Sequence, residues 1–180
     1  MLIRRDESLL LVVDLQEKLA PAIHQGEAAI ANNLRLLGSA RRLGVPAFVS
    51  EQYVRGLGPT VPAIKAAAVD ARFFEKMHFS CTGEPGVLEM LHAAHRPQVV
   101  LTGMEAHVCV LQTGLGLLGA GFQVFVVADA TASRTPENRD LALARLRAAG
   151  ADIVSSEMVL FEWLGQAGTD DFRAVLPLIK

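Results

Sequence analysis

The chain has 180 residues, of which 51% are hydrophobic, and 17 basic against 19 acidic side chains give a net charge of −2. A chain of this length buries a core of its own, and we expect a single domain over residues 1–180. The charge balance excludes a basic nucleic-acid-binding surface and attraction to an anionic membrane. Two cysteines cannot form a disulfide framework, and we see no secretion signal, so the sequence predicts a cytoplasmic protein.

The sequence predicts strands and helices that alternate along the chain. Continuous apolar runs indicate the strands, and apolar residues spaced three and four apart indicate the helices. In chain order, we expect a strand at residues 8–13, a helical turn within 15–23, a helix at 27–43, a strand at 45–50, a loop at 54–62, an extended segment at 72–80, a helix at 84–94, a strand at 99–101, a helix from 108 to 118, a strand at 123–128, a helix at 139–149, a strand at 152–155, and helices from about 157 and from 169.

Two segments carry additional expectations. Residues 54–62 are rich in glycine and proline, which predicts a surface loop that serves as a pocket wall or lid. In the segment 72–80, the period of two predicts that Phe74, Lys76 and His78 share one face, although a helix is the alternative for part of it. Pro85 is expected at the start of the next helix, where its missing N–H has no cost.

The alternation of strands and helices predicts a Rossmann-like, three-layer α/β/α sandwich with a mainly parallel central sheet. Sheets of this kind bind ligands beyond the carboxyl ends of their strands. Asp14, Gln52, Cys109 and Asp129 each follow a predicted strand. We therefore expect these four side chains to lie along one rim of the sheet.

Cys109 is the candidate nucleophile of the sequence. It falls in the first turn of a predicted helix, directly after a strand and the tight turn at Thr102 and Gly103. Unpaired N–H groups and the positive end of the helix dipole favour a thiolate there. Cysteine is also among the most buried residue types, so a small core residue is the alternative.

Three motifs in fixed order carry a resemblance to a known family. They are VVDLQ at 12–16, FEKMHFS at 74–80 and VVLTGMEAHVCV at 99–110. Together they resemble the isochorismatase-like cysteine hydrolases, and residues 51–62 and 127–134 are most similar to the branch called isochorismatase domain-containing proteins. The resemblance extends from about Leu9 to Trp163, and it implies the isochorismatase-like fold.

The resemblance implies a catalytic triad of Asp14, Lys76 and Cys109. In that reading the ammonium of Lys76 lowers the pKa of the thiol, and Asp14 accepts its proton and later returns it to the leaving amine. The resemblance also implies an oxyanion hole built from the backbone N–H groups of Glu105 and Cys109, and a cis peptide between Met104 and Glu105.

The resemblance also limits the chemistry. Nicotinamidases of this superfamily carry metal-binding histidines after the second strand, where this chain has Glu51, Gln52 and Tyr53. We therefore expect no metal and no cofactor. Isochorismatases proper lack the nucleophilic cysteine, so Cys109 favours acyl or amide chemistry.

A small-molecule pocket needs apolar walls and a few polar groups. The candidates for this pocket are Gln16, Gln52, Tyr53, Phe79 and Trp163.

Other residues have open roles. Cys81 is either a resolving thiol or, more simply, a free buried cysteine. His107 is a candidate support residue, although a residue two positions from Cys109 does not face it on a helix. His92 and His95 are expected to meet helix-end carbonyls and not a metal. Asp129 and Arg134 form a candidate pair that braces a loop.

Two classes of function fit the sequence. The first is a cysteine-dependent hydrolase of a small amide, ureide or related carbonyl compound, acting through a covalent thio-intermediate. The second is a non-enzymatic module on the same fold that binds a small ligand or a protein and has a redox-sensitive cysteine. Helices with few charges, and similarity to family members that assemble, predict a homo-oligomer.

Overall fold

A six-stranded parallel sheet forms the centre of the computed structural model, which describes residues 1–179. The order of the strands is β3-β2-β1-β4-β5-β6, and every neighbouring pair is parallel. This confirms the predicted sheet. The strands are β1 (Ser8–Val13), β2 (Ala47–Gln52), β3 (Arg72–Lys76), β4 (Gln98–Met104), β5 (Gln123–Ala132) and β6 (Asp152–Val154).

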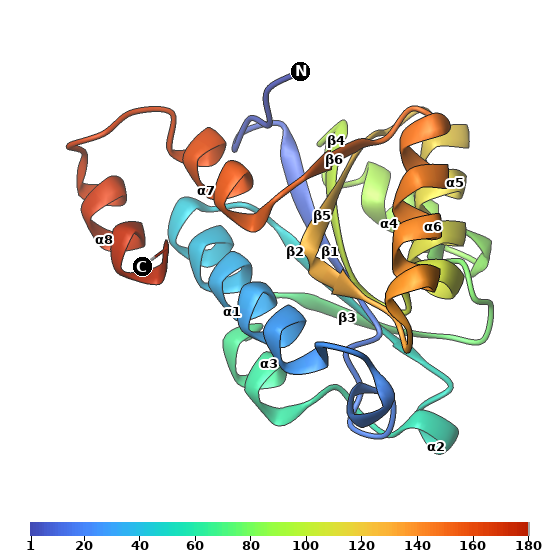
Figure 1. Cartoon of the computed structure of the whole chain (residues 1–180). Helices are drawn as coiled ribbons and strands as arrows, with labels where there is room; N and C mark the ends of the chain where they lie inside the picture. Colours follow the sequence, from blue (N-terminus) through green and yellow to red (C-terminus); the bar gives the residue numbers. More distant parts are fainter. Residues whose placement is uncertain (180) are drawn as a thin grey trace.

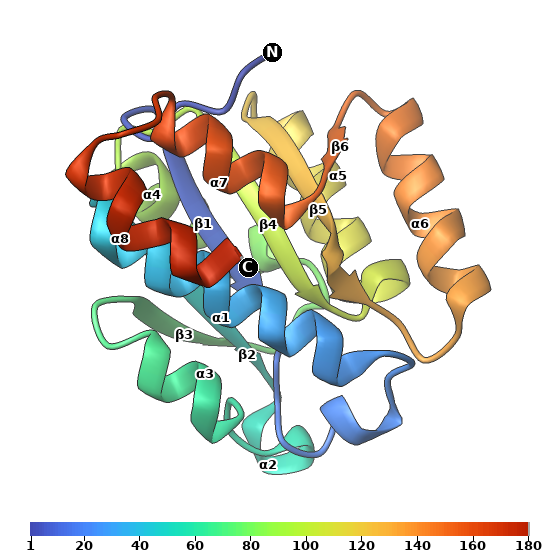
Figure 2. The ribbon, with the colours of Figure 1, turned by 60° about the vertical axis from the view of Figure 1, so that its left-hand side comes forward.

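Helices cover both faces of the sheet, which confirms the three-layer sandwich (Figure 1). α1, α3, α7 and α8 lie on one face, and α4, α5 and α6 lie on the other (Figures 1 and 2). The helices are α1 (Gly26–Leu43), α2 (Val54–Leu57), α3 (Pro62–Ala67), α4 (Val87–His92), α5 (Leu111–Gly119), α6 (Pro136–Ala148), α7 (Ser156–Leu164) and α8 (Asp170–Ile179).

The central strand β1 is apolar on both faces because both faces are covered. Leu10 and Val12 pack into the core beneath α1, α3 and α7. Leu9 and Leu11 pack into the second core beneath α4, α5 and α6. Alternate side chains of a strand point to opposite faces, so a continuous apolar run is what a central parallel strand requires.

Several elements differ from their predicted form. The segment 54–62 is not a plain loop, because it contains α2 and the first residue of α3. Pro85 lies outside α4, which begins after Gly86, a residue with a φ of 82°. The helix expected from residue 108 begins as a π-helical turn, Ala106–Val110, that continues into α5. His78 lies beyond the end of β3, so the strand covers only the first part of the expected extended segment 72–80.

The order of the strands reverses between β1 and β4, since β2 lies beside β1 and β5 lies beside β4. In open parallel sheets, the crevice beyond the carboxyl ends of the strands at such a point is where ligands bind. Asp14 follows β1 and Glu105 follows β4 at this position. The fold therefore places the predicted catalytic motifs at its natural ligand-binding edge.

Candidate active site

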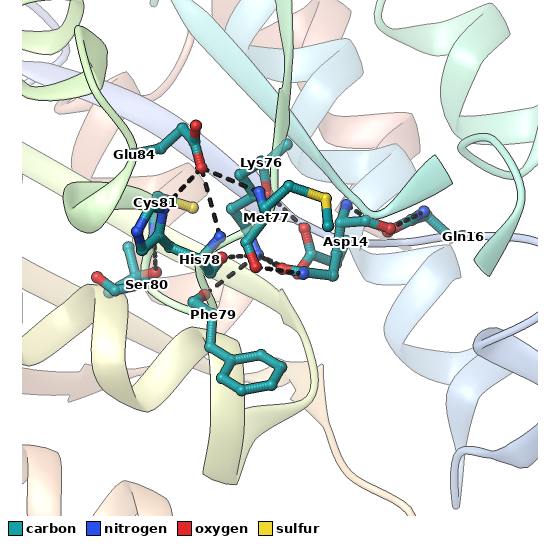
Figure 3. Close-up of polar contacts among 12 residues, drawn as sticks. Asp14, Gln16, Lys76, Met77, His78, Phe79, Ser80, Cys81 and Glu84 are labelled. Atoms are coloured by element: carbon teal, nitrogen blue, oxygen red, sulfur yellow. Dashed lines mark hydrogen bonds and ion pairs between the residues drawn. The ribbon is translucent and has the colours of Figure 1, made fainter. Parts of the chain in front are cut away.

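A buried ion pair forms the centre of the site. The Lys76 ammonium, at the end of β3, donates to Asp14 Oδ2 at 2.7 Å, and neither side chain is exposed to solvent. Figure 3 shows the two residues in one cluster of polar contacts, where Lys76 comes from the end of β3 and Asp14 directly follows β1. Charges buried this deeply are found in proteins where they are paired and hydrogen-bonded. The pairing brings together two of the three predicted catalytic residues from positions 62 residues apart.

Further acceptors surround the Lys76 ammonium. It also donates to Gln52 Oε1 at 2.6 Å and to the carbonyl oxygens of Phe79 at 3.1 Å and His78 at 3.4 Å. The Glu84 carboxylate fixes the loop that carries these carbonyls, since it accepts from the N–H groups of Met77 and His78 (Figure 3). Lys76 is thus held by side chains and backbone on several sides.

Asp14 is held by the backbone and by a hydroxyl group. Its φ is 52°, and Ser50 on β2 donates its hydroxyl to Asp14 Oδ1 at 2.7 Å. The backbone beside it approaches Gly103 of β4 so closely that a Cβ atom on Gly103 would collide with the backbone of Val13. Gly103 therefore allows β1 and β4 to meet where the site begins.

Cys109 lies in the π-helical turn after β4, is 7% exposed, and is close enough to Asp14 and Lys76 for their charges to act on its thiol. Burial and the negative charge of Asp14 raise the pKa of Cys109, and the positive charge of Lys76 offsets only part of this. The expectation of a lowered thiol pKa is therefore wrong. The helical turn and the lysine are both present, but desolvation and the charge of the Asp14 carboxylate outweigh them.

Burial acts on both members of the ion pair. It raises the pKa of Asp14 overall, and the charge of Lys76 and the hydrogen bond from Ser50 offset only part of this. Burial by itself lowers the pKa of Lys76, but the charge of Asp14 acts in the opposite direction, and the pKa of Lys76 is raised overall. These directions favour an ammonium at Lys76 and a protonated thiol at Cys109.

Glu105 lies between β4 and the π-helical turn and is tied to Arg134. Arg134 donates from Nε and Nη2 to the two carboxylate oxygens at 3.0 and 2.6 Å, and its backbone N–H adds a third contact at 3.0 Å. The Arg134 guanidinium holds the pKa of the Glu105 carboxyl below its usual range. The peptide bond between Met104 and Glu105 is cis. The expected pairing of Arg134 with Asp129 is wrong, because Glu105 is the partner.

Asp129 and Trp163 do not belong to the site. Asp129 lies within β5, which is longer than predicted, and its carboxylate accepts from the N–H and hydroxyl of Ser156 at the start of α7. Trp163 is buried in the core, where its Nε1 donates to Ser8 Oγ at 2.8 Å at the opposite end of β1. A tryptophan near the end of the matched region is a core residue here, and its role as a pocket wall is a wrong expectation.

The other pocket candidates divide into buried and exposed residues. Gln16 is buried, and its amide bonds Gln52 and the Gly58 carbonyl. Tyr53 and Phe79 are 49% and 55% exposed. The Phe79 ring points away from the polar cluster in Figure 3. The exposed rings remain candidates for the substrate side, whereas Gln16 is part of the framework.

The remaining cysteine and histidines have separate environments. Cys81 is buried, and burial raises the pKa of its thiol to about 11. His107 Nδ1 lies 3.0 Å from Ser133 Oγ. His92 stacks on Phe122 with ring centroids 4.5 Å apart. Within residues 1–179, no group of three or more metal-ligating side chains is present, and no helix is long and apolar enough to cross a membrane.

The sequence did not identify three residues that hold the site. They are Ser50, Glu84 and, as the partner of Glu105, Arg134. Ser50 ends the apolar run of β2 and points to the rim, which is a usable signal. Glu84 accepts from a backbone N–H group of a loop, and Arg134 binds Glu105, a residue 29 positions away. No local sequence pattern marks contacts of this kind.

Comparison with known proteins places this arrangement in a family. The model described as "Isochorismatase domain" matches residues 8–158. "Isochorismatase domain-containing protein 2" of Bos taurus is 40% identical over 176 residues, covering 96% of this chain and 83% of that protein.

Solved structures agree with this match. The MAR1 ribonuclease of Caenorhabditis elegans superposes with a TM-score of 0.93 at 39% identity, covering 99% of this chain and 92% of that one. The Escherichia coli YcaC gene product, described as an octameric hydrolase of unknown specificity, has a TM-score of 0.93 at 25% identity, covering 99% and 89%. The match over most of the chain and the shared fold lead to one conclusion: this chain belongs to the isochorismatase family.

Proposed function

We propose that the protein is a hydrolase that uses Cys109 as nucleophile, Asp14 as proton carrier and Lys76 as the fixed counter-ion. Its substrate class is a small amide, ureide or related carbonyl compound. The observation that carries the proposal is the buried Asp14–Lys76 ion pair, 2.7 Å long, whose charges both act on the Cys109 thiol. Family membership supports a hydrolase, since the related YcaC protein is described as one.

With Asp14 as a carboxylate, the site suits a coupled proton transfer. As the sulfur attacks the substrate carbonyl, the thiol proton passes to the Asp14 carboxylate, and the carbonyl oxygen becomes an oxyanion. N–H groups of Glu105 and Cys109, at the start of the helical segment, are the proposed donors to that oxyanion. Protonated Asp14 then gives its proton to the leaving amine, and a thioester to Cys109 forms.

Water completes the reaction. Asp14, again a carboxylate, takes a proton from the water that attacks the thioester, and the thiol is restored when the carboxylic acid leaves. Lys76 does not act as an acid in this scheme, because its ammonium already donates to Asp14, Gln52 and loop carbonyls. It remains the counter-ion of Asp14 whenever Asp14 is a carboxylate.

The binding-module alternative is less well supported. Redox-sensing cysteines are exposed thiolates, whereas Cys109 is 7% exposed and its thiol pKa is raised. The related C. elegans protein is named a ribonuclease. We propose no action on RNA for this chain, because its net charge is −2 and affinity for RNA comes largely from basic side chains.

The test is a panel of small amides, carbamoyl compounds and activated esters, followed by intact-mass analysis after acid quench. We expect an acyl adduct on the Cys109 peptide and turnover of at least one compound. Cys109→Ala and Asp14→Asn should lose turnover, while Cys81→Ala, a buried cysteine outside the proposed triad, should keep the adduct. Turnover in Cys109→Ala, or cleavage of RNA by the wild type, would contradict the proposal.

We also propose a homo-oligomer in the cytoplasm, consistent with the octameric YcaC relative and with two free cysteines in this chain. A monomer by light scattering at micromolar concentration would refute the assembly.

A further inference from the structure

Gln52 was expected to contact the substrate, but its side chain is engaged within the protein. It ends β2, which lies between β1 and β3, and is almost fully buried. Its Oε1 accepts from the Lys76 ammonium at 2.6 Å, and its Nε2 donates to the Met77 carbonyl at 3.0 Å. Both polar atoms of the amide therefore have partners in the protein.

The orientation of this amide is fixed by its neighbours. An ammonium group can only donate and a carbonyl can only accept, so the oxygen must face Lys76 and the nitrogen must face Met77. The backbone of Gln52 is held as well. Its N–H donates to Gln16 Oε1 at 2.8 Å, and its carbonyl accepts from Gln16 Nε2 at 2.9 Å.

Two glutamines thus link the carboxyl ends of three strands. Gln16 follows β1, Gln52 ends β2 and Lys76 ends β3. The linkage fixes where the ammonium stands relative to Asp14. A neutral acceptor at this place stabilises the ammonium and adds no second negative charge to compete with Asp14.

We propose that Gln52 is a positioning residue that holds the Lys76 ammonium against Asp14, and that it makes no contact with the substrate. This inference rests on the hydrolase function proposed above. It assigns Gln52 to the polar framework beneath the triad and leaves substrate contacts to the more exposed residues of the rim.

Several titratable groups face the Lys76 ammonium, and each enters the pH dependence. Asp14, which follows β1, and the thiols of Cys81 and Cys109 act on the pKa of Lys76. Two further ionisable groups nearby are already engaged, because Glu51 accepts from Thr60 and the His78 imidazole lies against Glu84.

The first experiment measures alkylation of Cys109 by iodoacetamide as a function of pH, with Cys109→Ala as background. Gln52→Glu places a carboxylate beside Lys76 and near Asp14. We expect the acid limb of the profile to move to higher pH by about one unit or more, because a like charge opposes ionisation of Asp14. Gln166→Glu, the same change at an exposed loop position, should leave the profile unchanged.

The second experiment separates positioning from substrate binding. Gln52→Met keeps the approximate length of the side chain, removes both polar atoms and introduces no new buried charge. With 4-nitrophenyl acetate as probe, we expect kcat to fall roughly tenfold to hundredfold, the value of a hydrogen bond to a charged group, with KM unchanged. Gln166→Met is the matched control.

The outcomes separate the two proposals. An alkylation profile of Gln52→Glu equal to that of the wild type, or a raised KM with unchanged kcat in Gln52→Met, would overturn the positioning role. If the wild type does not hydrolyse the ester or any amide, the hydrolase function fails, and the alkylation profile still decides the role of Gln52. If Gln52→Glu does not fold, the kcat and KM of Gln52→Met decide it.

Discussion

Substitution of Lys76 by Met tests the buried ion pair at the centre of the site. The change removes the cation but keeps most of the side-chain volume, so Asp14 remains buried with no counter-ion. Both side chains are fully buried and 2.7 Å apart. Breaking a buried pair of this kind costs about 3–5 kcal/mol, whereas an exposed pair contributes at most about 1 kcal/mol.

The loss should depend on pH in a defined direction. Without Lys76, burial raises the pKa of Asp14 in the folded state above the value of about 3.9 that applies in the unfolded chain. The folded variant then binds the proton more tightly than the unfolded variant does. Its stability deficit against the wild type must therefore shrink as the pH falls through the raised pKa.

The assay is urea unfolding followed by circular dichroism at several pH values. Lys65→Met, at an exposed position of α3, is the control and should change the free energy of unfolding by no more than about 0.5 kcal/mol. Combining Lys76→Met with Asp14→Leu should restore part of the loss, because the unpaired charge is then gone. A loss below about 1 kcal/mol, or a deficit that does not vary with pH, would refute the ion pair as described.

Three further changes test other parts of the structure. Trp163→Ala should cost about 3–5 kcal/mol of stability by thermal unfolding, because it removes a buried core side chain, and it should leave the KM of any substrate unchanged; a raised KM would return Trp163 to the pocket. In Cys109→Ala, the Cys81 thiol should be silent to Ellman's reagent at neutral pH and react only in urea, because its pKa is about 11; rapid native labelling would contradict its burial. Gly103→Ala should lower stability by about 3 kcal/mol or more, because the new Cβ meets the Val13 backbone at a φ of 117°, whereas Gly119→Ala, which faces open space, should have little effect.

The sheet could be predicted from the sequence because its central strands are buried on both faces. β1 and β4 are almost entirely apolar, and β5 begins with an apolar run, so each stands out from the amphipathic helices that flank it. Short elements were harder to recognise. α3 has only six residues, yet proline at its first position followed by alanines was a usable helix signal.

The positions of Asp14, Lys76 and Cys109 followed from strand ends and from the family motifs together. Their electrostatics did not. A helix start and a lysine predict a lowered thiol pKa, but the balance depends on burial and on the distance to the Asp14 carboxylate. Neither burial nor that distance can be predicted from local sequence, so the direction in which the pKa of Cys109 shifts could be found only from the structure.

Long-range partners could not be predicted for the same reason. Arg134 was expected beside Asp129, five residues away, but it pairs with Glu105 on another loop. Trp163 lies near the end of the motif region in the sequence and packs at the other end of β1 in space. Proximity along the chain is a poor guide where side chains reach across the edge of a sheet.

The rate at which Cys109 is alkylated by iodoacetamide at neutral pH, compared between the wild type and Asp14→Asn, tests the central claim most directly. If Asp14 takes the thiol proton as the sulfur attacks, the Asn variant has no carboxylate to accept that proton, while burial still raises the pKa of the Cys109 thiol. The variant should therefore be alkylated more slowly than the wild type. Equal or faster alkylation in Asp14→Asn would contradict the role of Asp14 as proton acceptor for Cys109.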